Sequence, residues 1–234
     1  KQGVCGQKGT CVDEWGCPFT ALQAGVIGEV LDPPLKTGAD VAAYEPPLEI
    51  LQTPLEGVNR FCAAGETFVR AAQCARPFER VQFLRGTQQT LIDIATGDRT
   101  FFRLLETVHA FYRDEMLRWA GTDVDALNFM DDWGGQWQLL IHPDAWRAIF
   151  KPLYRHYADI ARQHHKFLFM HSDGFIEAIY PDLIEIGVDA INSQLFCMDI
   201  EKLAALHKGK ITFWGEIDRQ HVLPRGTPDD ARRA

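Results

Sequence analysis

The sequence lacks features that would point to several classes of protein. No stretch approaches the roughly 18 to 20 consecutive apolar residues that cross a membrane, and the N-terminal segment has no apolar signal core. Positive charge is in deficit, since the formal net charge is -8. This balance argues against nucleic acid and anionic membrane surfaces as main partners. We therefore expect neither nucleic acid nor a membrane among its main partners.

Cysteine is also scarce. Six cysteines are spread over 234 residues, and their spacing is not that of a disulfide-rich secreted module. Cys5, Cys11 and Cys17 are evenly spaced. Their gaps of five residues do not match the roughly two to four residues between zinc-ribbon ligands. Reduced thiols in a cytoplasmic protein are the expectation.

Several catalytic motifs are missing as well. The sequence contains no GxGxxG, Walker A, GxSxG or HExxH pattern. Phosphate-binding loops, lipase-type nucleophiles and zincin metal sites therefore have no support.

What the chain does contain is an alternation of strand and helix patterns. Short apolar runs predict strands, and amphipathic spacing predicts the helices between them. Expected strands are 67–72, 125–130, 167–170, 188–192 and 211–214, and expected helices include 77–84, 87–94 and 101–120, with a further helix divided at Pro152. This alternation is typical of a parallel barrel or a doubly wound sheet, here short of a complete barrel at both ends.

The N-terminal part differs from the rest. Residues 1–60 are dense in Gly and Pro and predict an irregular lobe or β-hairpin lid, with strands at 11–17 and 25–30. Residues 61–234 are expected to form the barrel domain.

Polar side chains follow the expected strands at the point where each ends. They are Asp131, Asp132, Gln136, His171, Asp173, Gln194, Glu216 and Asp218. The carboxyl ends of parallel strands meet at one edge of a sheet, so these side chains should face one pocket. Such a pocket suits either a divalent metal or general acid–base chemistry.

Several of these residues also have a purely structural alternative. His171 could be a buried structural histidine. Asp173 could cap the helix that follows it. One of Asp131 and Asp132 could bond the neighbouring loop, and Glu216 with Asp218 could form a polar turn. Trp133 could stack on a ligand or close the mouth of the barrel.

Several segments in order resemble the uroporphyrinogen decarboxylase superfamily, most closely its corrinoid-dependent methyltransferase branch. They are MDDWGGQ, HPDAWRAIFKP, HSDG, IEIGVDAINSQ and ITFWGEID, and the resemblance covers about residues 65 to 234. The early VDEWGCPF segment also resembles a hairpin of that branch. The resemblance implies a (β/α)8 TIM barrel, incomplete in this chain, with its pocket at the carboxyl ends of the strands.

The implied activity is transfer of a methyl group between a small methylated substrate, such as an O-methyl compound, and a corrinoid. The corrinoid (methylcobalamin) would be carried by a partner corrinoid protein. In this interpretation the catalytic residues are His171, Asp173 and Asp132. The substrate-binding residues are Asp131, Trp133, Gln136, Gln194 and Asp218.

The same branch binds zinc through a His-x-Cys pair and a later Cys. Here the pair reads His171-Ser172-Asp173, so an aspartate replaces the first cysteine, and the later cysteine would fall beyond residue 234. The resemblance then implies an oxygen-rich metal site of His171, Asp173 and Glu216, which would polarise an ether or phenol oxygen as a Lewis acid.

Two alternatives remain open from sequence. One is a decarboxylase of porphyrinogen-like substrates, which needs arginines that face the pocket, and Arg85 and Arg219 are the candidates. The other is a non-catalytic barrel that binds a ligand without converting it.

Overall fold

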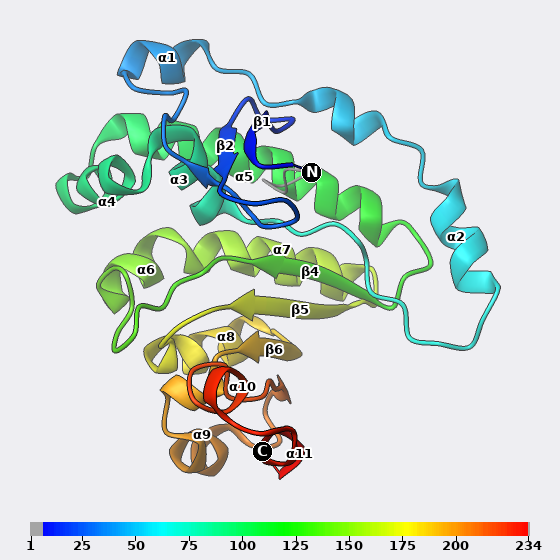
Figure 1. Cartoon of the computed structure of the whole chain (residues 1–234). Coiled ribbons are helices and arrows are strands. Elements are labelled where there is room, and N and C mark those ends of the chain that lie inside the picture. The colour runs from blue at the N-terminus through cyan, green and yellow to red at the C-terminus, as the bar shows by residue number, and fades with distance from the viewer. Residues whose placement is uncertain (1–6, 234) are drawn as a thin grey trace. The chain divides into compact units, whose positions relative to one another are not determined.

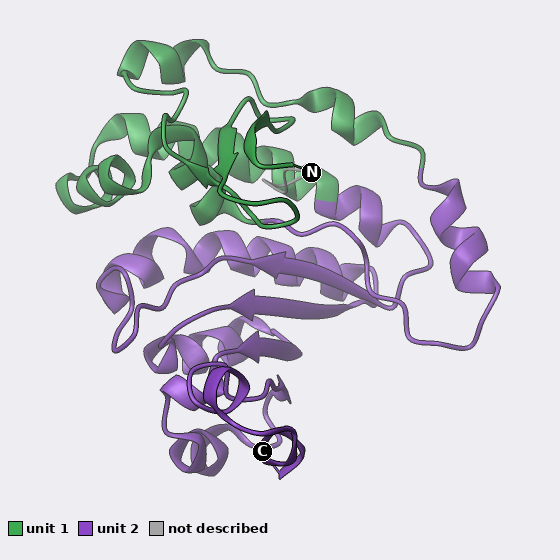
Figure 2. Ribbon diagram, in the orientation of Figure 1, with its two compact units in different colours: residues 1–54, 76–115 green, residues 55–75, 116–234 purple. Residues whose placement is uncertain are grey.

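A computed structural model describes residues 7–233, which form two compact units (Figures 1 and 2). Of the described residues, unit 1 comprises 7–54 and 76–115, and unit 2 comprises 55–75 and 116–233. Neither unit is one continuous segment, so the chain passes between them more than once. Each unit is described separately below.

Unit 1 contains a three-stranded antiparallel sheet in the order β1 (Gly9–Val12), β2 (Pro18–Ala21) and β3 (Glu29–Val30). The expected strand at 11–17 is wrong, because the chain reverses within it. Asp13 Oδ1 accepts hydrogen bonds from the backbone N–H groups of Trp15 (3.0 Å) and Cys17 (2.8 Å), which closes a turn. The strand expected at 25–30 is limited to β3.

The helices of unit 1 after residue 76 follow the predicted pattern, whereas the two helical segments before it lie where an irregular lobe was expected. The helical segments of the unit are α1 (Gly38–Ala43), the 3-10 helix η1 (Leu48–Gln52), α3 (Pro77–Arg85), α4 (Thr87–Thr96) and most of α5 (Arg99–Ala120), which continues into unit 2. Gly86 separates α3 from α4 at φ 88°, a conformation that glycine adopts without strain.

Unit 2 is built on four parallel strands, in the order β4 (Ala126–Met130), β5 (Phe167–Ser172), β6 (Ala190–Ser193) and β7 (Thr212–Trp214). Its helical segments are α2 (Glu56–Ala63), α6 (Pro143–Ile149), α7 (Lys151–Gln163), η2 (Glu177–Ile179), α8 (Tyr180–Ile186), η3 (Leu195–Cys197), α9 (Ile200–His207), α10 (Val222–Arg225) and α11 (Pro228–Arg233). The division at Pro152 is confirmed. Within the described residues the sheet does not close on itself, so the fold is an incomplete (β/α) barrel.

The segment 67–75, which lies beside β4, forms only two isolated parallel bridges with it, Arg70 with Ala126 and Ala75 with Phe129. Continuous strand pairing, expected at 67–72, is absent from this described stretch. The side-chain amide of Asn128 instead donates to the backbone carbonyl of Ala71, which replaces part of the backbone pairing between the two bridges.

The two faces of the unit 2 sheet differ. On the outer face, Phe129 of β4 packs on Tyr154 and Tyr157 of α7, with ring centroids 4.8 and 5.9 Å apart. Side chains alternate along a strand, so the next residues point to the inner face. Along β5 this inner set is Phe167, Phe169 and His171. His171 is therefore held on the inner face near the carboxyl edge.

Cysteine chemistry differs from the sequence expectation. Cys11 is disulfide-bonded, whereas Cys17, Cys62 and Cys197 are free. The number and spacing of the cysteines exclude a disulfide-rich module but do not exclude a single disulfide bond. Cys5, part of the evenly spaced trio, lies outside the described residues. None of the helices between residues 7 and 233 is long and apolar enough to span a membrane.

Candidate functional site

The loops after β4 and β5 interlock at two glycines. The N–H of Gly134 donates to the carbonyl of Asp173 (3.0 Å), and the N–H of Phe175 donates to the carbonyl of Gly135 (2.9 Å). A Cβ on Gly134 would lie 2.2 Å from the Phe175 nitrogen, and Gly174 has φ 77°. Only glycine permits this close approach, which brings the two loops together at the carboxyl edge of the sheet.

This interlocking brings two carboxylates beside His171. Asp132 Oδ1 accepts a hydrogen bond from the backbone N–H of Asp173 (2.9 Å). His171 Nε2 lies 3.6 Å from Asp132 Oδ1 and 3.5 Å from Asp173 Oδ1. One ligand atom from each of the three residues lies within 4.8 Å of the others. All three side chains are half-buried, so they form an accessible cluster.

Asn192 of β6 sets the orientation of the His171 ring. Its amide Nδ2 donates to the backbone carbonyl of Trp214 (2.9 Å), so its Oδ1 faces His171 Nδ1 at 2.7 Å. This hydrogen-bond network assigns the proton to Nδ1 and leaves the Nε2 lone pair directed at the carboxylates. Sequence reasoning missed Asn192, although it ends a predicted strand and pairs in register with His171.

A lone pair that faces two carboxylates is unfavourable unless a cation or a proton lies between them. Two tetrahedral zinc ligands at about 2.1 Å from the metal are about 3.4 Å apart. The observed separations of 3.5 and 3.6 Å match that spacing, and imidazole and carboxylate are both zinc ligands. The cluster therefore fits a divalent metal, and a protonated imidazole is the alternative.

Glu216, which the resemblance assigned to the metal, is engaged elsewhere. Its Oε2 lies 3.5 Å from Nε of Arg219, whose Nη2 forms an ion pair with Asp173. Burial raises the pKa of Glu216, and the Arg219 charge opposes this shift. Among the described residues, the three-ligand cluster thus contains Asp132 in place of Glu216.

Asp131 and Trp133 are fully buried. The phenol of Tyr154 donates to Asp131 Oδ2 (2.6 Å) and accepts from the indole Nε1 of Trp133 (2.9 Å). Burial, together with the Asp131 charge, raises the pKa of Tyr154 well above its usual value. The Trp133 ring packs edge-on against Phe150, with centroids 4.5 Å apart. Neither side chain is open to a substrate, in contrast to the expected contact role, and both instead hold the Asp132 loop against α7.

The remaining predicted residues stabilise loops at the same edge. Gln194 Oε1 accepts from the backbone N–H of Gly174 (2.7 Å). The side chains of Gln136 and Gln220 hydrogen-bond reciprocally (3.1 and 2.9 Å). The backbone N–H of His221 donates to Asp218 and lowers the pKa of that carboxyl. The structure thus gives each of them a local structural partner.

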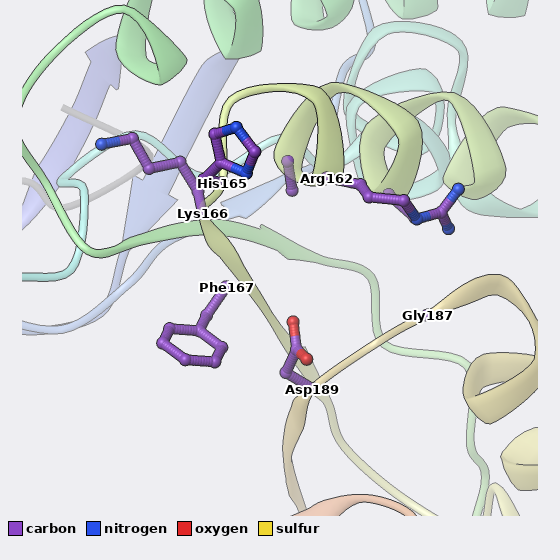
Figure 3. A pocket seen from close by; sticks show the side chains of 8 residues that line it. Arg162, His165, Lys166, Phe167, Gly187 and Asp189 are labelled. Atoms are coloured by element: carbon purple, nitrogen blue, oxygen red, sulfur yellow. The ribbon is translucent and has the colours of Figure 1, made fainter.

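A cavity of about 380 Å³ lies at the opposite, amino-terminal end of the strands (Figure 3). Two of its charged lining residues already have partners: Asp189 accepts from the backbone N–H of Leu168 (2.8 Å), and Arg162 donates to Asp159 (2.9 Å). In Figure 3 the side chains of Arg162 and His165 point in different directions. Arg162 and Asp189 are thus held by neighbouring groups of the protein.

Comparison with known families agrees with the architecture. The family model of uroporphyrinogen decarboxylase (URO-D) matches residues 12–234. This chain belongs to the URO-D family. The family resemblance predicted from sequence is thereby confirmed.

A solved structure, a methyltransferase from Methanosarcina mazei, shares the URO-D chain's fold with a TM-score of 0.71 at 14% sequence identity. The match covers 94% of this chain and 66% of that one, so the chain spans just under two thirds of its length. No protein of curated function matches the sequence. The structural likeness confirms the barrel-type fold.

Proposed function

We propose that this URO-D chain is a methyltransferase that moves a methyl group between a small methylated compound and a corrinoid on a partner protein. The observation that carries the proposal is the cluster of Asp132, His171 and Asp173 at the carboxyl edge of the sheet. Family membership and the fold shared with a methyltransferase support it.

The three side chains would hold a zinc ion, and the ion would act as a Lewis acid toward the oxygen that carries the methyl group. The corrinoid would supply the cobalt centre that accepts or donates the methyl group. Asn192 keeps the His171 lone pair directed at the cluster. When the methyl–oxygen bond breaks, its electrons remain on oxygen, which takes up a proton to become a hydroxyl group.

The first test is elemental analysis of the purified chain after zinc reconstitution. About one zinc per chain is expected, and His171→Ala should lose it because a three-ligand protein site then has only two. His164→Ala is the matched control, since His164 is exposed and lies outside the cluster. Equal zinc content in all three proteins, or none in any, would remove the metal from the proposal.

The second test measures methyl transfer directly. Reduced cobalamin and a panel of O-methyl compounds are supplied, and cobalamin methylation is followed by its absorption spectrum. Turnover by the wild type and its loss in His171→Ala are expected. Binding of a donor without turnover, under conditions where zinc is bound, would favour a non-catalytic barrel.

A decarboxylase is the second candidate, and Arg219 is the observation that favours it. Arg219 lies at the cluster and is 38% exposed. The other sequence candidate, Arg85, is buried in unit 1, where it donates to Asp93 (3.0 Å) and to backbone carbonyls. Release of carbon dioxide from a porphyrinogen carboxylate, lost in Arg219→Gln, would replace methyl transfer by this alternative.

A further inference from the structure

Near His171, the inner face of the unit 2 sheet carries two aromatic side chains. Phe169 lies two residues before His171 on β5, and Trp214 of β7 pairs in register with Asn192, the partner of His171. Residues two apart on a strand share a face. Phe169 and Trp214 therefore lie on the same face as the cluster: Phe169 is two residues deeper along β5, and Trp214 is level with His171, two strands away.

These rings form a platform, defined here as Phe169, Trp214 and Phe68. The Phe169 and Trp214 centroids are 6.1 Å apart at an interplanar angle of 61°, and Phe68 stacks on Phe169 at 5.7 Å. Trp214 is 41% exposed and Phe68 is 54% exposed. Large rings that remain open beside a polar cluster are typical of ligand sites.

A cation accompanies the platform. The guanidinium of Arg70 lies 4.4 Å from the centroid of the Trp214 ring. Within the part of the chain that the structure describes, Arg70 forms no side-chain ion pair or hydrogen bond, although its side chain has five N–H donors. Arg219, in contrast, is occupied by Asp173 and Glu216. The Arg70 fork is thus available to an anion that lies on the platform.

Asn128 adds a polar group on the same face. It pairs in register with Phe169. Its Oδ1 is buried and has no hydrogen-bond partner in the described residues. A buried acceptor of this kind is usually satisfied by water or by a ligand donor. The neighbourhood of the platform therefore offers a cation, π faces and an unused acceptor.

We infer that this platform binds a planar aromatic ring that bears a carboxylate. The carboxylate would pair with Arg70, and the ring would stack on Trp214 and Phe169. Two residues of strand span about 7 Å, which is comparable to the length of a benzoate with an ether oxygen opposite its carboxylate. That the ring presents a methyl ether to His171 rests on the proposed function, whereas binding of the ring does not.

The test is calorimetric titration of the full chain, without zinc or corrinoid, with 4-methoxybenzoate. Methoxybenzene lacks the charge of this probe, and cyclohexanecarboxylate lacks its π face, so each should bind at least roughly tenfold more weakly. Arg70→Gln and Trp214→Leu should each weaken binding of 4-methoxybenzoate by roughly tenfold.

Two variants keep the test decisive. Trp214→Phe retains an aromatic face and should retain most of the affinity, which separates stacking from misfolding of an edge strand. Arg113→Gln removes an exposed arginine of unit 1 that pairs with Asp114, and it should not change affinity. Absence of saturable binding, or equal affinity for cyclohexanecarboxylate, would overturn the inference.

The two proposals fail in different ways. If 4-methoxybenzoate binds through Arg70 and Trp214 but no methyl group reaches cobalamin, the proposed function fails and the platform stands. If only aliphatic ethers are demethylated and 4-methoxybenzoate does not bind, the platform fails and the proposed function stands.

Discussion

Two Arg–Asp pairs, one in each unit, show opposite uses of the same chemistry. In unit 1, Arg80 and Asp13 are 2.5 Å apart, and each side chain is 2% exposed. In unit 2, Arg219 and Asp173 are 38% and 33% exposed, and the same Asp173 oxygen also faces His171. Burial and full hydrogen bonding thus separate a fixed structural pair from an exchangeable one at the candidate site.

The buried pair is satisfied on every side. Asp13 accepts the two backbone N–H groups of the β1–β2 turn, and Arg80 reaches the phenol oxygen of Tyr112 (3.4 Å) and lies over the Trp15 ring. Burial alone disfavours the charged guanidinium, but Tyr112 and Asp13 outweigh it and raise the pKa of Arg80. At the open pair, solvent competes for the aspartate, and the proposed metal would compete for it as well.

The largest effect is expected from breaking the buried pair. Arg80→Met leaves Asp13 charged, buried and unpaired, so the free energy of unfolding should fall by about 3–5 kcal/mol. Urea denaturation, followed by spectroscopic signals from each unit, measures this change in the free energy of unfolding. Adding Asp13→Asn to the variant should recover part of the loss. Full stability of Arg80→Met alone would contradict the view that this pair is fixed.

A smaller loss of stability is expected at the Gly134–Gly174 contact, where the backbone positions the loop that carries Asp173. Gly174→Ala would place a Cβ 2.1 Å from the Gly134 carbonyl oxygen, so the loops must separate, at a cost of about 1–3 kcal/mol. The midpoint temperature of thermal unfolding should fall. Zinc affinity should also fall, because Asp173 moves with its loop.

Gly97→Ala is the matched control for this change. Gly97 has a similar φ of 69°, but nothing lies within 4 Å of its added Cβ. It therefore reports the cost of the left-handed conformation alone, about 1 kcal/mol. Equal losses for the two variants would show that the interlocking of the loops contributes nothing.

A substitution of Asn192 tests the site while the charges of Arg219 and Asp173 are retained. Asn192→Leu removes the acceptor that holds the Nδ1 proton of His171, so zinc affinity should fall by about 10–100-fold. Nitrogen NMR of the imidazole should show a mixture of tautomers. Asn192→Asp keeps an acceptor and should restore the Nδ1-protonated form. An unchanged tautomer in Asn192→Leu would show that the ring is oriented by other contacts.

Much of this architecture could be predicted from sequence, because periodicity is a local property. The strands that end before Asp132, Asp173 and Glu216 were located by short apolar runs. The register between strands is not local, however, and it decides which strand-end residues meet. Met130 pairs with His171, which places Asp132 rather than Glu216 in the three-residue cluster.

Residue type alone also did not predict whether a side chain at the end of a strand is buried or exposed. Trp133 follows a strand, as a ligand-stacking residue would. Its indole N–H nevertheless donates to the phenol oxygen of Tyr154 on α7, and the ring is buried in the core. The uneven pairing at 67–72 has a similar origin, since Asn128 substitutes a side-chain bond for a backbone one. Both outcomes depend on contacts between segments that are distant in sequence.

The smallest stability effect is expected at the open pair itself. Arg219→Gln should change the free energy of unfolding by less than about 1 kcal/mol, because an exposed pair is offset by solvent and by side-chain entropy. Zinc affinity should instead rise, since the guanidinium no longer competes for the Asp173 oxygen, and the gain should shrink as salt screens the charge. Competition with a fluorescent chelator at two ionic strengths measures it, with Arg113→Gln as control. Destabilisation as large as that of Arg80→Met would mean that exposure does not distinguish the two pairs.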